Sequence, residues 1–199
     1  MAPREIGVSP NGGEVFTDTA VVSWNASDAD LDSLTHVVQY SAADGATWQA
    51  VGVGINNTNV YTLDLTLLPG GDHSRIQIIA SDGVNTGSDA SDAAFHVARK
   101  LPTARILSPA NDSHYTPGQA IILVGQGTDV EDGTLADSVL TWQSNVSGIL
   151  GSGRMLDVTG LSAGKHTITL MATDSNGYTA TAGIHIFAGA KVYLPLIVK

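Results

Sequence analysis

Hydrophobic and polar residues alternate with a period of two in short segments along most of this chain. In the first half, Ala20–Asn25 alternates around Val22 and Trp24, and Thr35–Tyr40 alternates in the same way. This period is typical of β-strands with one buried face, and pairs such as Asn-Gly and Asp-Gly place turns between the segments. The same pattern predicts further strands in this half at 48–51, 60–63, 74–80 and 94–97.

The second half repeats this design. The pair Ser-Pro occurs at 9–10 and again at 108–109, and each is followed by an acidic turn and then by a late Ala-Ser-Asp or Ala-Thr-Asp. A repeat of about 100 residues is the size of one immunoglobulin-like β-sandwich, and no segment shows the spacing of an amphipathic helix. The sequence therefore predicts an all-β protein made of two tandem immunoglobulin-like β-sandwich domains. Strands of the second half are predicted at 120–124, 138–143, 155–158, 166–172 and 184–187.

Domain boundaries follow from the repeat. We predict a first sandwich at 1–98, a linker at 99–103, a second sandwich at 104–188 and a separate C-terminal segment at 189–199. Two interpretations of that last segment stay open: a final strand of the second sandwich, or a sorting tail like the Tyr-Leu-Pro-Leu ending of some exported bacterial proteins. The N-terminal residues lack the basic and apolar regions of a signal peptide. We therefore expect a fragment of a longer exported protein.

Charge and composition narrow the function classes. Nine Lys and Arg face nineteen Asp and Glu, which gives a net charge of -10 and a surface that repels phosphate backbones. Nucleic acid is therefore not an expected partner. Cysteine is absent, so neither disulfides nor thiolate metal sites are predicted. No apolar run approaches the roughly 20 residues of a transmembrane helix, and no such segment is predicted.

Specific motifs of the first half resemble those of a known group of extracellular modules. Trp24, the strand Val37–Ser41, Asp44-Gly45, Trp48 and the turn Leu68–Gly70 are similar to those of bacterial fibronectin type III-like and related immunoglobulin-like modules. The half departs from fibronectin type III proper because a histidine, not a tyrosine, follows its Pro-Gly turn. The superfamily is therefore better supported than the family.

The second half resembles immunoglobulin-like or cadherin-like modules found near the C-terminus of exported bacterial enzymes and adhesins. The motifs that carry this resemblance are Asp129–Gly133, Trp142 and Ala172–Gly177. The Trp-Asp-Phe-Gly-Asp-Gly run of PKD modules is missing from it. The resemblance implies an extracellular or cell-surface setting in a bacterium.

Acidic turns are the best candidates for chemistry. In an extended segment Asp28, Asp30 and Asp32 would share one face, where a cation would relieve their repulsion. Calcium takes roughly six to eight oxygen ligands from such loops. In the modules that the chain resembles, the acidic turn and an Asp at the end of a late strand can lie at the same end of the sandwich. The predicted calcium ligands are Asp28, Asp30, Asp32, Asp82, Asp129, Glu131, Asp132 and Asp174.

The alternative is that these residues only cap their own backbone, because Asp beside Gly is common turn chemistry. Calcium, if bound, would stiffen loops rather than take part in a reaction, and no other cofactor is expected.

Other patterns give little support for catalysis. Gly160–Gly164 matches Gly-x-Ser-x-Gly, but an alternating strand follows it instead of the helix that a hydrolase nucleophile needs. Six scattered histidines lack metal-ligand spacing, and most are expected to face solvent. Trp24 and Trp142 are predicted in the core, while Trp48 is left open as a candidate for sugar stacking.

Three function classes remain. The first is a non-catalytic accessory region that spaces or presents another domain of the parent protein. The second is an adhesion module that binds a carbohydrate or a surface protein. The third, a free-standing enzyme, has the least support and is not predicted. The expected partners are accordingly other domains of the parent, or a cell-surface protein or polysaccharide.

Overall fold

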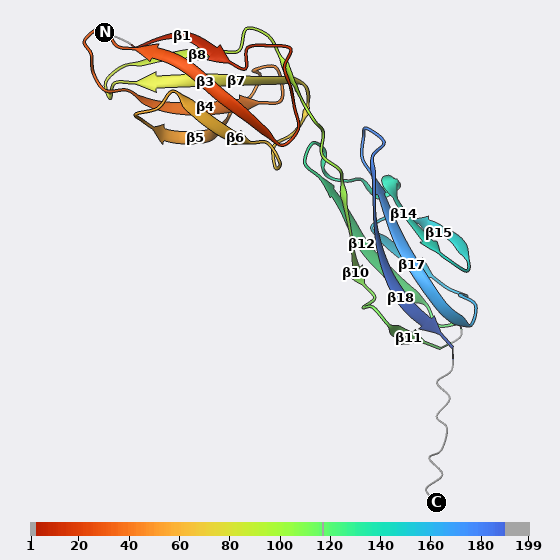
Figure 1. Ribbon diagram of the computed structural model, residues 1–199. Helices are drawn as coiled ribbons and strands as arrows, with labels where there is room; N and C mark the ends of the chain where they lie inside the picture. Colours follow the sequence, from red (N-terminus) through yellow and green to blue (C-terminus); the bar gives the residue numbers. More distant parts are fainter. Residues whose placement is uncertain (1–2, 117, 190–199) are drawn as a thin grey trace, which may run out of the picture. The chain divides into compact units, whose positions relative to one another are not determined.

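A computed structural model describes residues 3–116 and 118–189 of the chain (Figure 1). The chain divides into two compact units, residues 1–100 and 101–199. This division falls within the segment predicted as a linker, whose last residue, Thr103, already begins a strand. Residues 190–199, for which a strand and a sorting tail stayed open, lie outside the described part of the chain.

The first unit consists of two sheets. One has the order β1-β3-β6, and the other has the order β2-β9-β7-β4-β5 with β8 also paired to β7. Strand β2 runs parallel to β9, while the other pairs are antiparallel. The strands are β1 (Arg4–Ser9), β2 (Val15–Phe16), β3 (Thr19–Ser27), β4 (Thr35–Ser41), β5 (Gln49–Ile55), β6 (Val60–Asp64), β7 (Gly71–Ser81), β8 (Thr86–Ala90) and β9 (Phe95–Val97).

The second unit has the same topology. Its sheets have the orders β10-β12-β16, with β13 added beside β12, and β11-β18-β17-β14-β15, with β11 parallel to β18. Its one short 3-10 turn among the described residues is η1. The elements are β10 (Thr103–Ser108), β11 (Ser113–Tyr115), β12 (Ile121–Asp129), β13 (Gly133–Thr134), η1 (Asp137–Val139), β14 (Leu140–Ser144), β15 (Gly148–Ser152), β16 (Met155–Val158), β17 (Gly164–Thr173) and β18 (Thr179–Ala188).

Each unit has its own apolar core between its two sheets. In β3 the inward residues Ala20, Val22 and Trp24 are buried, as the alternation of the sequence predicts. They pack against residues of the facing sheet, among them Tyr40 and Ile78. The predicted core position of Trp24 is confirmed, and the two layers form an immunoglobulin-like β-sandwich.

The core of the second unit centres on Trp142, which is fully buried. Gly125 of β12 lies beneath it, where a Cβ would come within 2.9 Å of the indole and 2.5 Å of Leu170. The sheet therefore approaches the indole closely only because this position has no side chain. The prediction that Trp142 belongs to the core is confirmed.

The strand predictions need two kinds of correction. Ser138 and Val139 form η1 and the strand begins at Leu140, because the amide of Val139 donates to the carbonyl of Ala136 and closes a turn. Several strands were also missed, namely β1, β2, β8, β10, β11, β13 and β15. Most of these have few or no alternating apolar residues, so they carry little pattern of their own.

Candidate functional site

The acidic turn of the first unit is a compact loop rather than an extended segment. Asp28 directly follows β3, and its Oδ1 accepts hydrogen bonds from the amides of Asp30 (2.8 Å) and Asp32 (3.4 Å). Leu31 has a left-handed φ of 62°, which bends the chain between them. Asp28 is buried, whereas Asp30 and Asp32 are exposed. The expectation that the three carboxylates share one face of an extended segment is therefore wrong.

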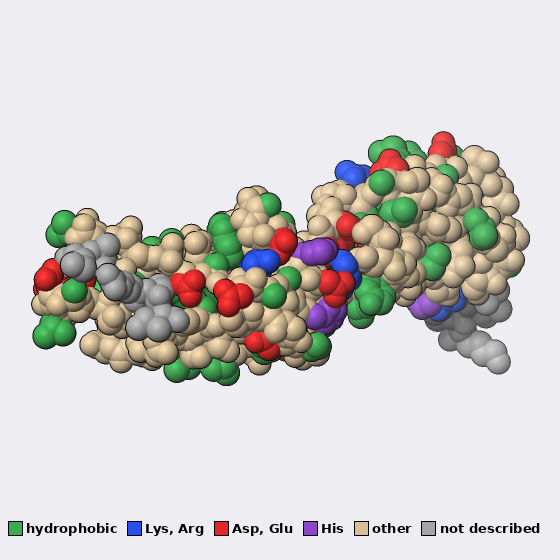
Figure 2. Space-filling model, turned by 90° about the horizontal axis from the view of Figure 1, so that it is seen from above, with side chains coloured by type: hydrophobic (Ala, Val, Ile, Leu, Met, Phe, Trp, Pro, Cys, Tyr) green, Lys and Arg blue, Asp and Glu red, His purple; other side chains and the backbone are tan. Residues whose placement is uncertain are grey.

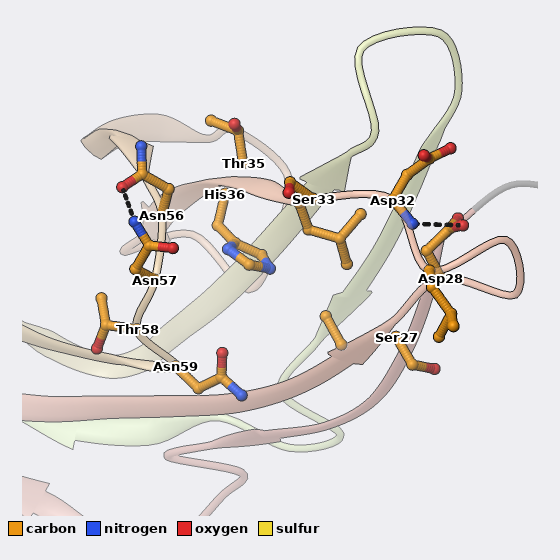
Figure 3. Close-up of a pocket in the computed structure, with 13 residues that line it drawn as sticks. Ser27, Asp28, Asp32, Ser33, Thr35, His36, Asn56, Asn57, Thr58 and Asn59 are labelled. Atoms are coloured by element: carbon orange, nitrogen blue, oxygen red, sulfur yellow. Dashed lines mark hydrogen bonds between the residues drawn. The ribbon is translucent and has the colours of Figure 1, made fainter.

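This turn forms one wall of an open depression of about 920 Å³ at the loop end of the first sandwich (Figure 3). The opposite wall is the loop Asn56–Asn59 between β5 and β6. The imidazole of His36 stands between the two walls in Figure 3. The lining is dominated by Asn, Ser and Thr side chains, so the surface offers hydroxyl and amide groups of both hydrogen-bonding polarities.

His36 occupies an inward position of β4 and is only 4% exposed. Its Nδ1 lies 3.3 Å from the carbonyl oxygen of Ile55, so Nδ1–H is the donor in this pair. Burial lowers the pKa of His36, and the hydrogen bond to Ile55 opposes that effect only in part. The ring is therefore neutral near pH 7, and Nε2 presents a lone pair.

Three unsatisfied polar atoms cluster in this region. Four buried side-chain polar atoms of the described residues have no hydrogen-bond partner, and Trp24 Nε1, Asp28 Oδ2 and His36 Nε2 are three of them. The rings of Trp24 and His36 lie 5.2 Å apart between centroids. Buried polar atoms are almost always paired, and an unpaired one costs about 1–3 kcal/mol. Three of the four unpaired buried side-chain atoms of the described residues thus belong to this end of the first sandwich, which makes it a candidate binding site.

The late acidic residue of the first unit also caps its own turn. Asp82 follows β7, and its Oδ1 accepts from the amides of Val84 (2.7 Å) and Asn85 (2.6 Å). Hydrogen bonds from the amides of Asn85 and Val84 lower the pKa of the Asp82 carboxyl, with a smaller contribution from the Asn85 side chain. The carboxylate is thus committed to closing the β7–β8 hairpin.

The second unit repeats the arrangement of Asp28 at Asp129. Its Oδ1 accepts from the amides of Glu131 (2.9 Å) and Asp132 (3.0 Å), and its Oδ2 is the fourth unsatisfied buried atom. Asp174, only 6% exposed, accepts from the amides of Asn176 and Tyr178, both at 2.8 Å. Both residues act as turn caps of the same kind.

The structure does bring the two acidic turns of the second unit together. Both carboxylate oxygens of Asp132 accept hydrogen bonds from Ser175, one from the amide (2.7 Å) and one from the hydroxyl (2.8 Å). Ser175 directly follows Asp174, so these two turns lie at the same end of the sandwich, as the resemblance to extracellular modules implies. Their carboxylates, however, contact N–H and O–H donors.

Metal binding was the chemistry predicted for these turns. Within the described ranges, no three Asp, Glu or His side chains lie close enough together to hold a metal ion. The described contacts of Asp28, Asp82, Asp129 and Asp174 are those of backbone caps. Calcium binding by the eight predicted residues stays a prediction from the sequence.

The remaining candidate residues have structural positions. Ser162 lies in the irregular segment before β17, and its carbonyl accepts from Nε2 of His166, which supports the interpretation of Gly160–Gly164 as a turn. His166 is fully buried and its Nδ1 lies 2.8 Å from Ser144 Oγ. Trp48 is half-buried against Gly45. The expectation that most histidines face solvent therefore fails at His36 and His166.

Acidic side chains outnumber basic ones on the described surface. Acidic side chains are spread over both units in Figure 2, and basic ones are few. Lys and Arg do not line the depression beside His36, whereas Asp28 and Asp32 do. A phosphate, sulfate or carboxylate ligand would therefore meet repulsion there. No helix of the described residues is long and apolar enough to cross a membrane.

Sequence and structure comparisons give the following results. No protein-family profile matches the chain, and no curated protein matches it. Among solved structures, it is similar to the fibronectin(III)-like modules of Clostridium thermocellum CbhA, with 15% identity over 94% of each chain and a TM-score of 0.41. It is also similar to titin A168-A169, with 12% identity, 96% and 100% coverage and a TM-score of 0.44. The titin tandem A164-A165 is 13% identical to it, with 96% of this chain and 100% of the titin chain covered and a TM-score of 0.38.

Each of the two units has the fold of an immunoglobulin-like β-sandwich. This assignment rests on the strand pairing of each unit. Similarities at these identities and TM-scores carry no information about function. The tandem contains a depression that sequence reasoning missed. In the sequence, Asn56 and Asn57 indicate only a turn, and His36 is one residue of the predicted strand 35–40. An isolated polar residue at an inward position of an alternating strand was the signal that could have identified His36.

Proposed function

We propose that this chain is a non-catalytic accessory region of an exported bacterial protein, where it spaces or presents another domain. One observation carries the proposal: a single topology occurs twice, and each copy encloses its own core. A module with its own core adds length to a protein without depending on its neighbours for stability. The extracellular setting comes from the resemblance of the sequence to exported modules and is part of the same proposal.

The polar loops support this role better than a catalytic one. Asp82 and Asp174 use their carboxylates to close turns, and Asp132 joins two loops. Catalytic sites instead leave a nucleophile or a base free beside a group that positions it. His166, the histidine nearest the Gly-x-Ser-x-Gly pattern, has both ring nitrogens in hydrogen bonds inside the core.

Exchange of the tandem within its parent protein tests the proposal. Residues 1–189 would be replaced either by an unrelated tandem of two β-sandwiches or by a Gly/Ser linker of equal residue number. We expect the unrelated tandem to preserve the activity or surface display of the parent and the flexible linker to reduce it. If both replacements abolish the parent's activity as fully as deletion does, the surface of this tandem itself is required, and a spacer role is wrong.

Calcium stiffening is a secondary part of this proposal and has its own test. Extracellular modules hold calcium with dissociation constants of about 0.1–1 mM. A site at ten times its dissociation constant adds only about 1.4 kcal/mol to the free energy of unfolding. Thermal unfolding with calcium and with chelator would reveal that gain as a higher Tm of one transition. Coincident curves would remove calcium and leave the acidic residues as backbone caps.

A further inference from the structure

The depression between the Asp28–Thr35 segment and the Asn56–Asn59 loop has no role in spacing two domains. We propose that it binds hydroxyl groups of a neutral carbohydrate. This inference does not rest on the proposed spacer function, because it concerns a surface of the first unit alone. It gives that unit a binding role in addition to its place in the tandem.

The proposal rests on two hydrogen-bond acceptors without a partner, each on a residue that lines the depression. Asp28 Oδ2 and His36 Nε2 have no hydrogen-bond partner, and both residues line the depression while being 8% and 4% exposed. With Nδ1–H directed at the carbonyl of Ile55, Nε2 of the neutral ring can only accept. The missing groups are therefore donors, and a carbohydrate hydroxyl supplies a donor and an acceptor on one atom.

Charge selects a neutral ligand over an anionic one. The lining contains the carboxylates of Asp28 and Asp32 and no Lys or Arg. Sulfated or carboxylated sugars would approach two negative groups without compensation. The ligand therefore presents hydroxyls without an anionic substituent.

The described lining also shows no geometry specific for a cation. No three acidic or histidine side chains of the described residues gather here to hold a metal ion. An organic ammonium group is usually enclosed by aromatic faces, but the walls contain no Trp, Tyr or Phe. Most of the lining groups are instead neutral amides and hydroxyls, Asn57, Thr58 and Asn59 among them. Such groups match the mixed donors and acceptors of a sugar ring.

The geometry sets one requirement for binding. Each unsatisfied atom exposes less than 1 Å² to solvent, so a hydroxyl reaches it only when the two walls move slightly apart. Both walls are loops at the end of the sandwich, where such movement costs the least. Without an aromatic platform, binding is expected to be weak, with a dissociation constant of about 1–10 mM.

Amide NMR of the whole chain provides the test. The probes are methyl α-D-mannopyranoside, methyl β-D-glucopyranoside and methyl β-D-galactopyranoside, titrated one at a time. We expect at least one to give saturable shift changes confined to 28–36 and 56–59. Ethylammonium chloride and calcium chloride serve as comparison ligands. The proposal is wrong if none of the three glycosides shifts the signals of these residues, whether or not one of the two salts shifts them.

Substitutions separate binding from folding. Asp28→Asn keeps an Oδ1 acceptor for the turn and removes the free carboxylate oxygen, so we expect affinity at least tenfold weaker. Asp129→Asn is the matched control, because it makes the same change in an equivalent turn of the other unit, where the residue does not line this depression. Asn59→Ala changes an exposed wall residue and should weaken binding without altering Tm. Unchanged affinity in both Asp28→Asn and Asn59→Ala would overturn the assignment.

Discussion

Asp132 and Ser175 join two loops of the second sandwich that are far apart in the sequence. Both carboxylate oxygens of Asp132 accept from Ser175, one from its amide at 2.7 Å and the other from its hydroxyl at 2.8 Å. Hydrogen bonds to a charged acceptor are stronger than those between neutral groups. This contact therefore fixes the turn after β12 against the turn after β17, although Asp132 itself is exposed.

Removal of this link should destabilise the second domain. We expect Asp132→Ala to lower its free energy of unfolding by about 1–2 kcal/mol, which corresponds to a Tm decrease of about 4–16 °C for a domain of this size. Thermal unfolding followed by circular dichroism measures this effect. Asp137→Ala, at an exposed residue that makes only a 3.6 Å ion pair with Arg154, is the control and should change Tm little. Equal effects of the two substitutions would contradict the structural role of Asp132.

The close approach of β12 to Trp142 gives a second prediction. Gly125→Ala would place a Cβ 2.5 Å from Leu170 Cδ2 and 2.9 Å from the indole, so the core must shift. We expect a loss of about 1–3 kcal/mol from overpacking. Gly183→Ala is the matched control in the same domain, since its nearest contact would be the carbonyl oxygen of Ile168 at 3.9 Å. Denaturant unfolding should show a lower midpoint for the first variant only.

A buried hydroxyl of the first domain gives a third prediction. Tyr40 Oη donates to the carbonyl of Pro69 at 2.6 Å and lies 2.9 Å from Ser74 Oγ. Tyr40→Phe leaves both groups short of a partner in the core, which should cost about 1–3 kcal/mol. Tyr178→Phe, at a half-exposed residue of the second domain, serves as the control. Chemical unfolding that shows no difference between the variants would mean that water replaces the lost hydroxyl.

The pH dependence of the first domain should reflect His36. Burial lowers its pKa in the folded protein, so above the ordinary histidine pKa of about 6.5 the ring is neutral in both the folded and unfolded states. As the pH falls below that value, the unfolded chain binds a proton that the folded domain resists. The contribution of His36 to the free energy of unfolding is therefore fully present above about pH 6.5 and is lost as the pH falls through the pKa of His36 in the folded state.

Thermal unfolding at pH 7.5 and pH 5.5 measures this effect. We expect Tm of the first domain to decrease on acidification. In His36→Asn, where the Nδ2 amide can replace Nδ1–H as the donor to Ile55, this decrease should be smaller. Because the other titrating groups are common to both proteins, equal decreases in Tm between pH 7.5 and pH 5.5 would show that His36 does not cause the effect.

Much of the architecture could be predicted from the sequence because its causes are local. A period of two at Val22 and Trp24 requires one face of β3 to be buried whatever the partner strand is. The repeat of this pattern in both halves predicted two sandwiches. The acidic residues after β3 and β12 were correctly located as turns, since Asp accepts from amides two or three residues further along.

The tertiary structure alone decided which polar groups lack partners. His36 and His166 both occupy inward positions of strands, yet His166 has partners on both ring nitrogens and His36 on only one. In the second domain the partners of His166 are Ser162, four residues earlier, and Ser144, which lies on another strand. In the first domain the described partner of His36 is the carbonyl of Ile55, also on another strand. Periodicity describes which face a side chain occupies but not the atoms that meet it there. The local pattern of the sequence therefore determined the fold, while long-range packing created the candidate binding site.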